Sequence, residues 1–397
     1  TEDPPRRAAR ETYDLPFAAH GGRRSVLVVG AGTGNDVAAA LRHGYDRVVA
    51  VDIDPVILGL GARLHPERPY SDPRVVRSVG DARAFFEQNV SERFDVVCYG
   101  LLDSHAMFSA MSSLRLDNYV YTLEGIRAGW GHVAEGGVLA LSFGTSEPWL
   151  VQRLRELVRL GTGQDPVVVR RRGAVSLLAR RGAVASPPTV PEPAGAAPPS
   201  TAGIRIPTDD WPFLYLKPGE IPWAYISVLA LILATAWVAI RGVYGTALRG
   251  REFDSALFLM GAGFMLLETR MVTELSLLFG STWIVNSSVF FGILLMAFLS
   301  NLYVSRRPVR RPDAWYVPLV ACLLLTWAMG AGTLNGLPIT YRWIVGGVLF
   351  ALPVGFAGVI LSSVLRRSGN AAGSLGSNLI GALVGGAGHR AEEPAEL

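Results

Sequence analysis

Short apolar runs alternate with helical patterns over the first half of the chain. Residues 25–30 (SVLVVG) form a continuous apolar run, which is typical of a strand buried on both faces of a sheet. The same reasoning predicts strands at 47–54, 74–82, 94–100 and 137–143, helices near 119–133 and 148–160, and a closing hairpin of 166–170 with 175–180. This order predicts an α/β doubly wound, Rossmann-like sheet with ligands at the carboxyl ends of its strands.

From residue 223 onward the pattern changes to long apolar runs. Residues 223–240 are long enough to cross a bilayer as a helix, because a span takes about 20 residues. Residues 371–388 form a weaker run, whose small residues suit close helix packing. The runs between them occupy 255–279, 282–304, 314–334 and 342–365. The sequence therefore predicts an α-helical transmembrane bundle of about five or six helices.

These patterns divide the chain into segments. Pro, Ala and Gly dominate a stretch with no pattern of its own, which is typical of an extended linker. The expected segments are a lead-in (1–22), the sheet domain (23–181), the linker (182–206), a junction at the membrane surface (207–222), the membrane domain (223–388) and a polar tail (389–397). Asp209 and Asp210 in the junction can contact a cationic substrate or lipid headgroups, or cap local turns. The chain begins at Thr1 without Met, so we expect trimming or a longer parent protein.

Charge and cysteine content argue against several classes of function. The net charge is +4, and nearly all positive charge is arginine, with Lys217 the only lysine. Arginines gather between the apolar runs, and no basic stripe is interleaved with aromatic residues, so no nucleic-acid partner is expected. Cys98 and Cys322 cannot make a disulfide framework or a zinc site. No metal-ligand spacing involves His65, His105 or His132, so no metal is expected.

A glycine turn marks the candidate cofactor site. Gly30, Gly32 and Gly34 follow the first strand and open a helix, where the backbone can approach a ligand closely. Asp52 ends the second strand and can accept two hydrogen bonds from ribose hydroxyls. Asp81 ends the third strand, where it can bind an adenine amino group. The two acids favour an S-adenosylmethionine site over a dinucleotide site or an empty domain.

Two nearby features stay open at this stage. Asp54 either helps to hold the ribose or caps the helix that begins at Pro55. Residues 64–74 form a Pro-rich loop that either borders the adenosine or acts as a spacer.

A polar cluster, Asp103-Ser104-His105, follows the fourth strand, where the acceptor should lie. His105 is the best general-base candidate by its ordinary pKa, and Asp103 can orient it or contact the substrate. The alternative is a solvated turn. Ser104 is a further acceptor-side candidate. So are four residues that follow, which form a lid or else cap and pack the next helix: Arg115, Asp117, Tyr119 and Tyr121.

Several stretches together resemble a known family. VLVVGAGTGNDVAAAL, AVDIDPVI, DPRVVRSVGDARAFF, FDVVCYG and GGVLALSF resemble the spermidine synthase-like branch of the class I S-adenosylmethionine-dependent transferases, over residues 23–181. TDDWPFLYL and GFMLLETRMVTELSLLFGSTWIVNSS look like the membrane part of bacterial multispanning proteins that carry such a domain. The resemblance implies a methyltransferase-like fold and either S-adenosylmethionine or its decarboxylated form as cofactor.

The chain departs from the aminopropyltransferase pattern at two acids. Thr33 stands where the family has an acid that helps to hold the cofactor, and Gly100 stands where the family has the first acid after strand four. We therefore expect methyl transfer to a small-molecule or lipid-like, membrane-associated acceptor, with Asp103 and His105 as catalytic residues. Aminopropyl transfer is the second hypothesis, and a non-enzymatic transporter or sensor that binds a nucleoside is the third.

Three charged residues lie inside an apolar run: Glu268, Arg270 and Glu274. Arg270 and Glu274 are four apart and can pair on one helix face. Charges at membrane depth face a bundle interior or a cavity, so the cluster predicts either a polar pocket, a transport path or an ion pair that fixes the bundle.

We expect a multi-pass protein of the bacterial cytoplasmic membrane. The soluble domain should be cytosolic, because its cofactor is made there. The arginine-rich loops 241–251, 305–311 and 366–367 should also face the cytosol, yet a first span at 223–240 would separate them from the soluble domain. One run must then fail to cross, and the charged run 255–279 is the candidate.

Overall fold

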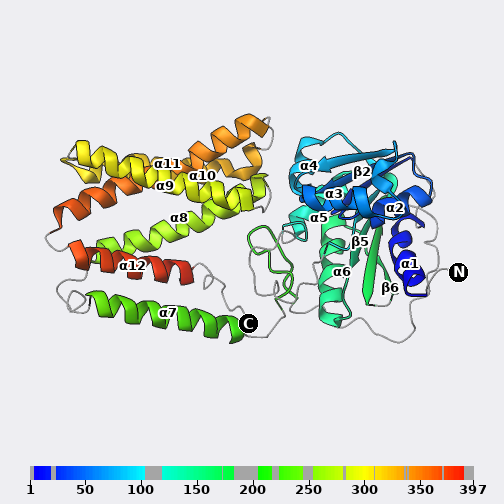
Figure 1. Cartoon of the computed structure of the whole chain (residues 1–397), viewed down its shortest axis with the longest axis horizontal. Coiled ribbons are helices and arrows are strands. Elements are labelled where there is room, and N and C mark those ends of the chain that lie inside the picture. Colours follow the sequence, from blue (N-terminus) through cyan, green and yellow to red (C-terminus); the bar gives the residue numbers. More distant parts are fainter. Residues whose placement is uncertain are drawn as a thin grey trace. The chain divides into compact units, whose positions relative to one another are not determined.

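The structure is a computed structural model of the chain, which forms two compact units (Figure 1). Residues 1–220 make up most of the first unit and residues 221–397 most of the second. The structure describes residues 4–18, 24–102, 119–171, 173–182, 204–216, 223–244, 254–279, 283–307, 309–334, 337, 339–368 and 371–388.

The first unit is built on a seven-stranded sheet in the order β3-β2-β1-β4-β5-β7-β6. Strands β1 to β5 run parallel, and β7 and then β6 add antiparallel strands beside β5. The strands are β1 (Ser25–Val29), β2 (Arg47–Asp52), β3 (Val75–Val79), β4 (Phe94–Tyr99), β5 (Val133–Phe143), β6 (Val167–Arg171) and β7 (Ala174–Arg180). The predicted doubly wound sheet is confirmed, and its switch point lies between β1 and β4.

Helices cover both faces of this sheet. Val28 belongs to one core, whereas its neighbours Leu27 and Val29 belong to the other. A strand turns successive side chains to opposite faces, so a strand buried on both sides must be apolar throughout. One face carries α1 (Pro4–Ala18), α2 (Asn35–Arg42) and α3 (Pro55–Leu64), and the other carries α4 (Ala82–Gln88), α5 (Leu123–Gly131) and α6 (Pro148–Thr162).

Two segments outside the predicted sheet domain also belong to the first unit. The lead-in contains α1, whose Phe17 meets the ring of Tyr45 edge-on at a centroid distance of 6.0 Å. Residues 204–216, which the sequence assigns to the linker and junction, pack against the domain with Leu214 only 1% exposed. The buried Arg153 holds this segment by donating to the carbonyl oxygens of Leu214 and Leu216, at 2.7 and 2.6 Å.

The second unit is helical. Its helices are α7 (Trp223–Tyr244), α8 (Ser255–Phe279), α9 (Trp283–Arg306), α10 (Tyr316–Leu334), α11 (Ile339–Arg367) and α12 (Ala371–Gly388), with a 3₁₀ turn, η3 (Pro312–Trp315), before α10. Among the residues that the structure describes, four stretches are long and apolar enough to cross a membrane: Ser255–Leu275, Ser287–Arg306, Pro312–Met329 and Tyr341–Arg367. The region is therefore consistent with a membrane domain, in which four of the five or six expected spans are candidates by length and composition.

Small residues bring α8 and α12 together. A side chain at Gly381 would overlap the backbone of Phe258, and a Cβ at Gly385 would lie 2.5 Å from the carbonyl oxygen of Ala262. The Asn378 side-chain amide donates to the carbonyl oxygen of Leu257 at 3.0 Å. The small-residue run thus packs closely against α8, as predicted for 371–388.

Candidate functional site

The glycine turn follows β1 and leads into α2. Gly30, Gly32 and Gly34 have φ angles of 68°, 53° and 103°, which lie in the region that favours glycine. The backbone N–H groups of Gly30 and Ala31 donate to the carbonyl oxygen of Val51, at 2.8 and 3.0 Å. These bonds fix the turn beside the end of β2.

Asp52 closes the turn from that side. Its Oδ2 accepts a hydrogen bond from the N–H of Gly32 at 2.7 Å, and its Oδ1 accepts one from the N–H of Asp54 at 2.8 Å. Burial raises the pKa of Asp52, and the two backbone donors oppose that rise. A carboxylate offers more than one acceptor direction on each oxygen, so both oxygens retain capacity for ribose hydroxyls.

The next acids along the chain cap helices. Asp54 accepts from the N–H groups of Val56 and Ile57, at 2.7 and 3.4 Å, and so begins α3. This favours the capping interpretation of Asp54 over the ribose interpretation. Asp81 begins α4 in the same way, with its Oδ1 accepting from the N–H groups of Arg83 and Ala84.

Asp81 can still serve an adenine. Both of its capping bonds use Oδ1, which leaves Oδ2 as the oxygen for an adenine amino group. Burial raises its pKa, and the two backbone donors and Arg83 oppose the rise. The sequence-based role of Asp81 at the end of β3 therefore remains a prediction that its geometry allows.

Tyr70 is a site residue that the sequence reasoning missed. It lies in a 3₁₀ turn, η1 (Pro69–Ser71), within the Pro-rich loop. Its hydroxyl donates to the carbonyl oxygens of Ala31 and Gly32, at 3.1 and 2.8 Å, and its ring lies near Gly34. The loop 64–74 therefore buttresses the glycine turn, which a sequence pattern without spatial contacts cannot reveal.

The predicted acceptor side begins at the end of β4. The N–H of Gly100 donates to the carbonyl oxygen of Val29 at 3.2 Å, so the chain stays paired with β1 up to this point. Leu102 then lies directly over Gly30, where a Cβ would overlap its side chain. The predicted residues Asp103, Ser104, His105, Arg115 and Asp117 lie outside the described residues.

The two tyrosines of the predicted lid, Tyr119 and Tyr121, are among the described residues. Tyr121 is completely buried and meets Phe143 edge-on at a centroid distance of 5.3 Å, so the packing interpretation is correct for it. The carbonyl oxygen of Tyr119 accepts a hydrogen bond from Arg83 at 3.0 Å.

Asp36 is a second residue that the sequence reasoning missed. It lies in the first turn of α2, is 5% exposed, and its burial raises its pKa to about 7. A Cβ added at Gly100 would lie 2.6 Å from its Oδ2. The available signal was an acid directly after the glycine turn, on the face of a helix that is otherwise Val and Ala.

The charged run of the second unit contains the predicted ion pair. A guanidinium nitrogen of Arg270 lies 3.5 Å from a carboxylate oxygen of Glu274 in α8. Glu268 lies on the same helix. Among the residues that the structure describes, no group of three or more His, Cys, Asp or Glu is arranged to hold a metal ion.

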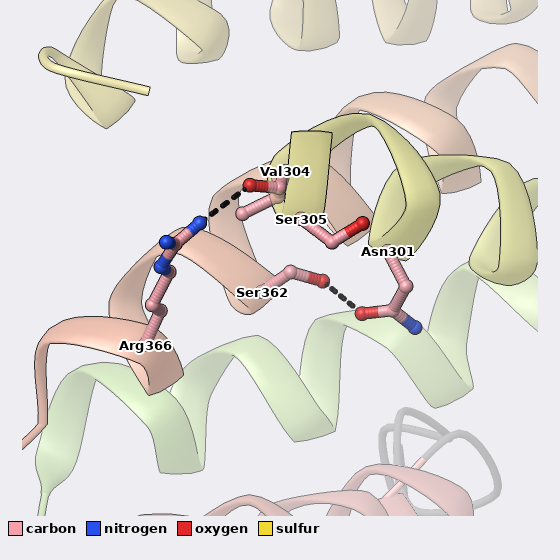
Figure 2. Close-up of a pocket in the computed structure, with 5 residues that line it drawn as sticks. All are labelled: Asn301, Val304, Ser305, Ser362 and Arg366. Carbon is pink, nitrogen blue, oxygen red and sulfur yellow. Dashed lines mark hydrogen bonds between the residues drawn. The ribbon is translucent and has the colours of Figure 1, made fainter. Parts of the chain in front are cut away.

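A small polar pocket lies between α9 and α11 (Figure 2). Its volume is about 300 Å³, and it is lined by Asn301, Val304, Ser305, Ser362 and Arg366. Ser362 donates to the side-chain oxygen of Asn301 at 2.6 Å, and Arg366 donates to the carbonyl oxygen of Val304 at 2.7 Å. Its polar groups therefore join the two helices to each other.

The fold and the site together define a class. A parallel sheet with a glycine turn after β1 and acids after β2 and β3 is the arrangement expected of an S-adenosylmethionine-type nucleoside site. Residues 10–139 match the family described as "Spermine/spermidine synthase domain". The N-terminal part of the chain is a spermidine synthase-like domain.

Individual relatives agree with this family. A stretch of 87 residues is 32% identical to the polyamine aminopropyltransferase of Hamiltonella defensa and covers 21% of this chain and 30% of that protein. A stretch of 156 residues is 30% identical to polyamine aminopropyltransferase 2 of Hyperthermus butylicus and covers 38% and 48%. The matches thus span less than half the length of these relatives. The spermidine synthase structure from Thermotoga maritima is 17% identical, with a TM-score of 0.35, over 44% of this chain and 60% of that one.

Proposed function

We propose that the chain is a membrane-bound transferase that moves the aminopropyl group of decarboxylated S-adenosylmethionine to an amine. The observation that carries the proposal is the turn of Gly30 to Gly34 closed by Asp52, within a domain that matches the spermidine synthase family. From the sequence alone, the departures at Thr33 and Gly100 favour methyl transfer. The comparisons support the opposite order, because the curated relatives are polyamine aminopropyltransferases.

The described residues suggest how the cofactor would be held. The positive φ angles at Gly30, Gly32 and Gly34 let the backbone approach the ligand. Asp52 would accept from the ribose hydroxyls and Asp81 from the adenine amino group. Asp103 and His105 remain candidates for contact with the acceptor. The four candidate spans support membrane anchoring of the enzyme.

A direct assay tests the proposal. The full chain, purified in lipid nanodiscs, is incubated with 1,4-diaminobutane and either decarboxylated or intact S-adenosylmethionine, and the products are identified by mass spectrometry. We expect an aminopropylated amine and a thioether nucleoside from the decarboxylated cofactor only. Asp52→Ala should abolish product formation. A methylated product from the intact cofactor, with no aminopropyl product, would overturn the proposal.

Methyl transfer to a hydrophobic acceptor remains the second candidate, favoured by Thr33 and Gly100. Calorimetry with the two cofactors separates the candidates, because a methyltransferase should bind the intact form more tightly. The transporter or sensor hypothesis makes a different prediction. If Asp52→Ala abolished cofactor binding and left the cellular function of the protein intact, the enzyme hypothesis would fail, because a transferase needs its cofactor.

A further inference from the structure

Asp36 is a buried carboxyl group at the switch point of the sheet. It enters from α2, and its Oδ1 lies 3.9 Å from Sγ of Cys98 on β4. Its Oδ2 lies 2.6 Å from where a Cβ at Gly100 would be. The carboxyl group therefore occupies the space beside the end of β4 that a side chain at position 100 would otherwise need.

This position is costly for a carboxyl group. The neighbouring residues of α2 (Val37, Ala38, Ala39 and Ala40) are buried and apolar, so another apolar residue would suit the core. None of the ion pairs found among the described residues involves Asp36. A buried carboxyl group without a cationic partner is more often a functional group than a stabilising one.

The surroundings connect Asp36 to the proposed cofactor site. Gly100 pairs with Val29, the last residue of β1, and Leu102 covers Gly30. Asp36 therefore lies beside the carboxyl ends of β1 and β4, the place in the sheet where ligands of such folds bind. Asp52 and Asp81 lie instead at the ends of β2 and β3, on the side of the proposed nucleoside.

We propose that Asp36 is the carboxylate that receives the acceptor amine and removes its proton. This inference rests on the proposed aminopropyl transfer. An alkyl amine has a pKa near ~10, so at neutral pH it carries a proton that blocks its lone pair. Decarboxylated S-adenosylmethionine is cationic at sulfur, so a carboxylate also lessens the repulsion between the two cationic substrates.

The step balances as follows. The Asp36 carboxylate takes one proton from the ammonium group of the acceptor and becomes a neutral carboxylic acid. The freed lone pair of the nitrogen forms a bond to the aminopropyl carbon attached to sulfur. The carbon–sulfur bond breaks, and its electron pair neutralises the sulfonium to a thioether. The product leaves as a secondary ammonium ion, and Asp36 returns its proton to solvent.

The titration of Asp36 depends on the groups around it. Cys98 faces it from β4, and its thiol pKa is raised by burial and then by Asp36. Tyr70 faces it from η1, and its phenol pKa is raised by burial first and also by Asp52 and Asp36. The raised pKa of Asp36 suits a base, because proton transfer is most effective when that pKa lies near the working pH.

The test compares the full-length wild type with Asp36→Asn, which keeps the shape of the side chain. In Asp36→Asn we expect kcat/KM for 1,4-diaminobutane to fall about 10²–10⁴-fold at neutral pH. The affinity for decarboxylated S-adenosylmethionine, measured by calorimetry, should change less than about threefold. The deficit should shrink as pH rises toward ~10, because the amine then loses its proton without a base.

Two further variants sharpen the test. In Asp36→Ala/Gly100→Asp the carboxylate is moved to the end of β4, and activity should exceed that of Asp36→Ala alone. Asp46→Asn removes an exposed acid and should leave kcat/KM unchanged.

Each outcome has a defined meaning. If the wild type transfers the aminopropyl group and the kcat/KM of Asp36→Asn stays within about threefold of wild type, the role of Asp36 is overturned. The proposed function then still stands. A variant whose deficit is the same at every pH also overturns the role, because a structural defect would not be relieved by a neutral amine. A wild type that transfers no aminopropyl group ends both proposals.

Discussion

The guanidinium of Arg83 and the carboxylate of Asp209 form a bidentate ion pair in which both N–O distances are 2.8 Å. Arg83 lies in α4, two residues after Asp81, and Asp209 lies in the segment 204–216. The hydroxyl of Thr122 also donates to Asp209, at 2.7 Å. This pair therefore fastens the segment 204–216 to α4, close to the proposed adenine position.

Removing this pair should destabilise the first unit. Asp209→Ala leaves the mostly buried Arg83 without its carboxylate, which should cost about 2–3 kcal/mol. The melting temperature of a domain of this size should then fall by roughly 5–10 °C, measured by scanning calorimetry of the full chain. Asp210→Ala is the matched control, because Asp210 is exposed and adjacent. Equal shifts for the two variants would contradict the assignment.

Asp52 and Asp54 should separate binding from stability. Asp52→Ala removes the proposed acceptor of both ribose hydroxyls and should weaken nucleoside binding about 10²-fold or more, by calorimetry with the decarboxylated cofactor. Asp54→Ala removes the cap of α3 and should cost about 1 kcal/mol of stability, with binding close to wild type. If Asp54→Ala weakened nucleoside binding as strongly as Asp52→Ala, both carboxylates would have to accept hydrogen bonds from the ribose hydroxyls.

The raised pKa of Asp36 predicts a pH-dependent stability. The folded chain binds a proton at Asp36 up to about pH 7, whereas the unfolded chain releases it near 3.8. Between these values the folded state holds more protons, so this residue's contribution to stability is present below pH 3.8 and is lost as pH rises through 7. The full difference is on the order of 4 kcal/mol.

Asp36→Asn cannot ionise and should remove this dependence. Denaturant unfolding at pH 5 and pH 8 should therefore show the variant gaining stability relative to wild type at the higher pH. Asp46→Asn provides the comparison for an exposed acid. If the difference in unfolding free energy between the wild type and Asp36→Asn were the same at pH 5 and pH 8, the pKa of Asp36 would not be raised in the folded chain.

The sequence predicts features that depend on local pattern. Apolar runs locate the strands, and the glycine turn and Asp52 follow from their spacing after β1 and β2. Contacts between distant positions are different. The pairing of Arg83 with Asp209, and the meeting of Asp36 with Gly100, depend on how the chain folds back, and neither leaves a periodic trace. Helix α1 was missed because its segment is charged and proline-containing, with few apolar residues to suggest burial.

The helices also suggest how the arginine-rich loops and the first unit can share one side of a membrane. Among the described residues α8 is a candidate span, whereas within α7 only the shorter apolar stretch Ile226–Thr235 was found. We predict that α7 does not cross, so that the first unit and the start of α8 would lie on one side. Four crossings by α8 to α11 then return the chain to that side at Arg307 and again at Arg366 and Arg367. This predicted topology would satisfy the positive-inside rule, with α7 in place of 255–279 as the run that stays outside the bilayer core.

Cysteine labelling tests this topology in the full chain. In a background of Cys98→Ala and Cys322→Ala, one cysteine is placed at Arg307, between α9 and α10, or at Leu337, between α10 and α11. A membrane-impermeant maleimide should label Leu337→Cys in intact bacterial cells and Arg307→Cys only after lysis, because arginine-rich loops are retained in the cytosol. Labelling of Arg307→Cys in intact cells would show instead that α7 crosses, with the arginine-rich loops outside. A cytosolic transferase domain would then require arginine-rich loops outside the cell, against the positive-inside rule.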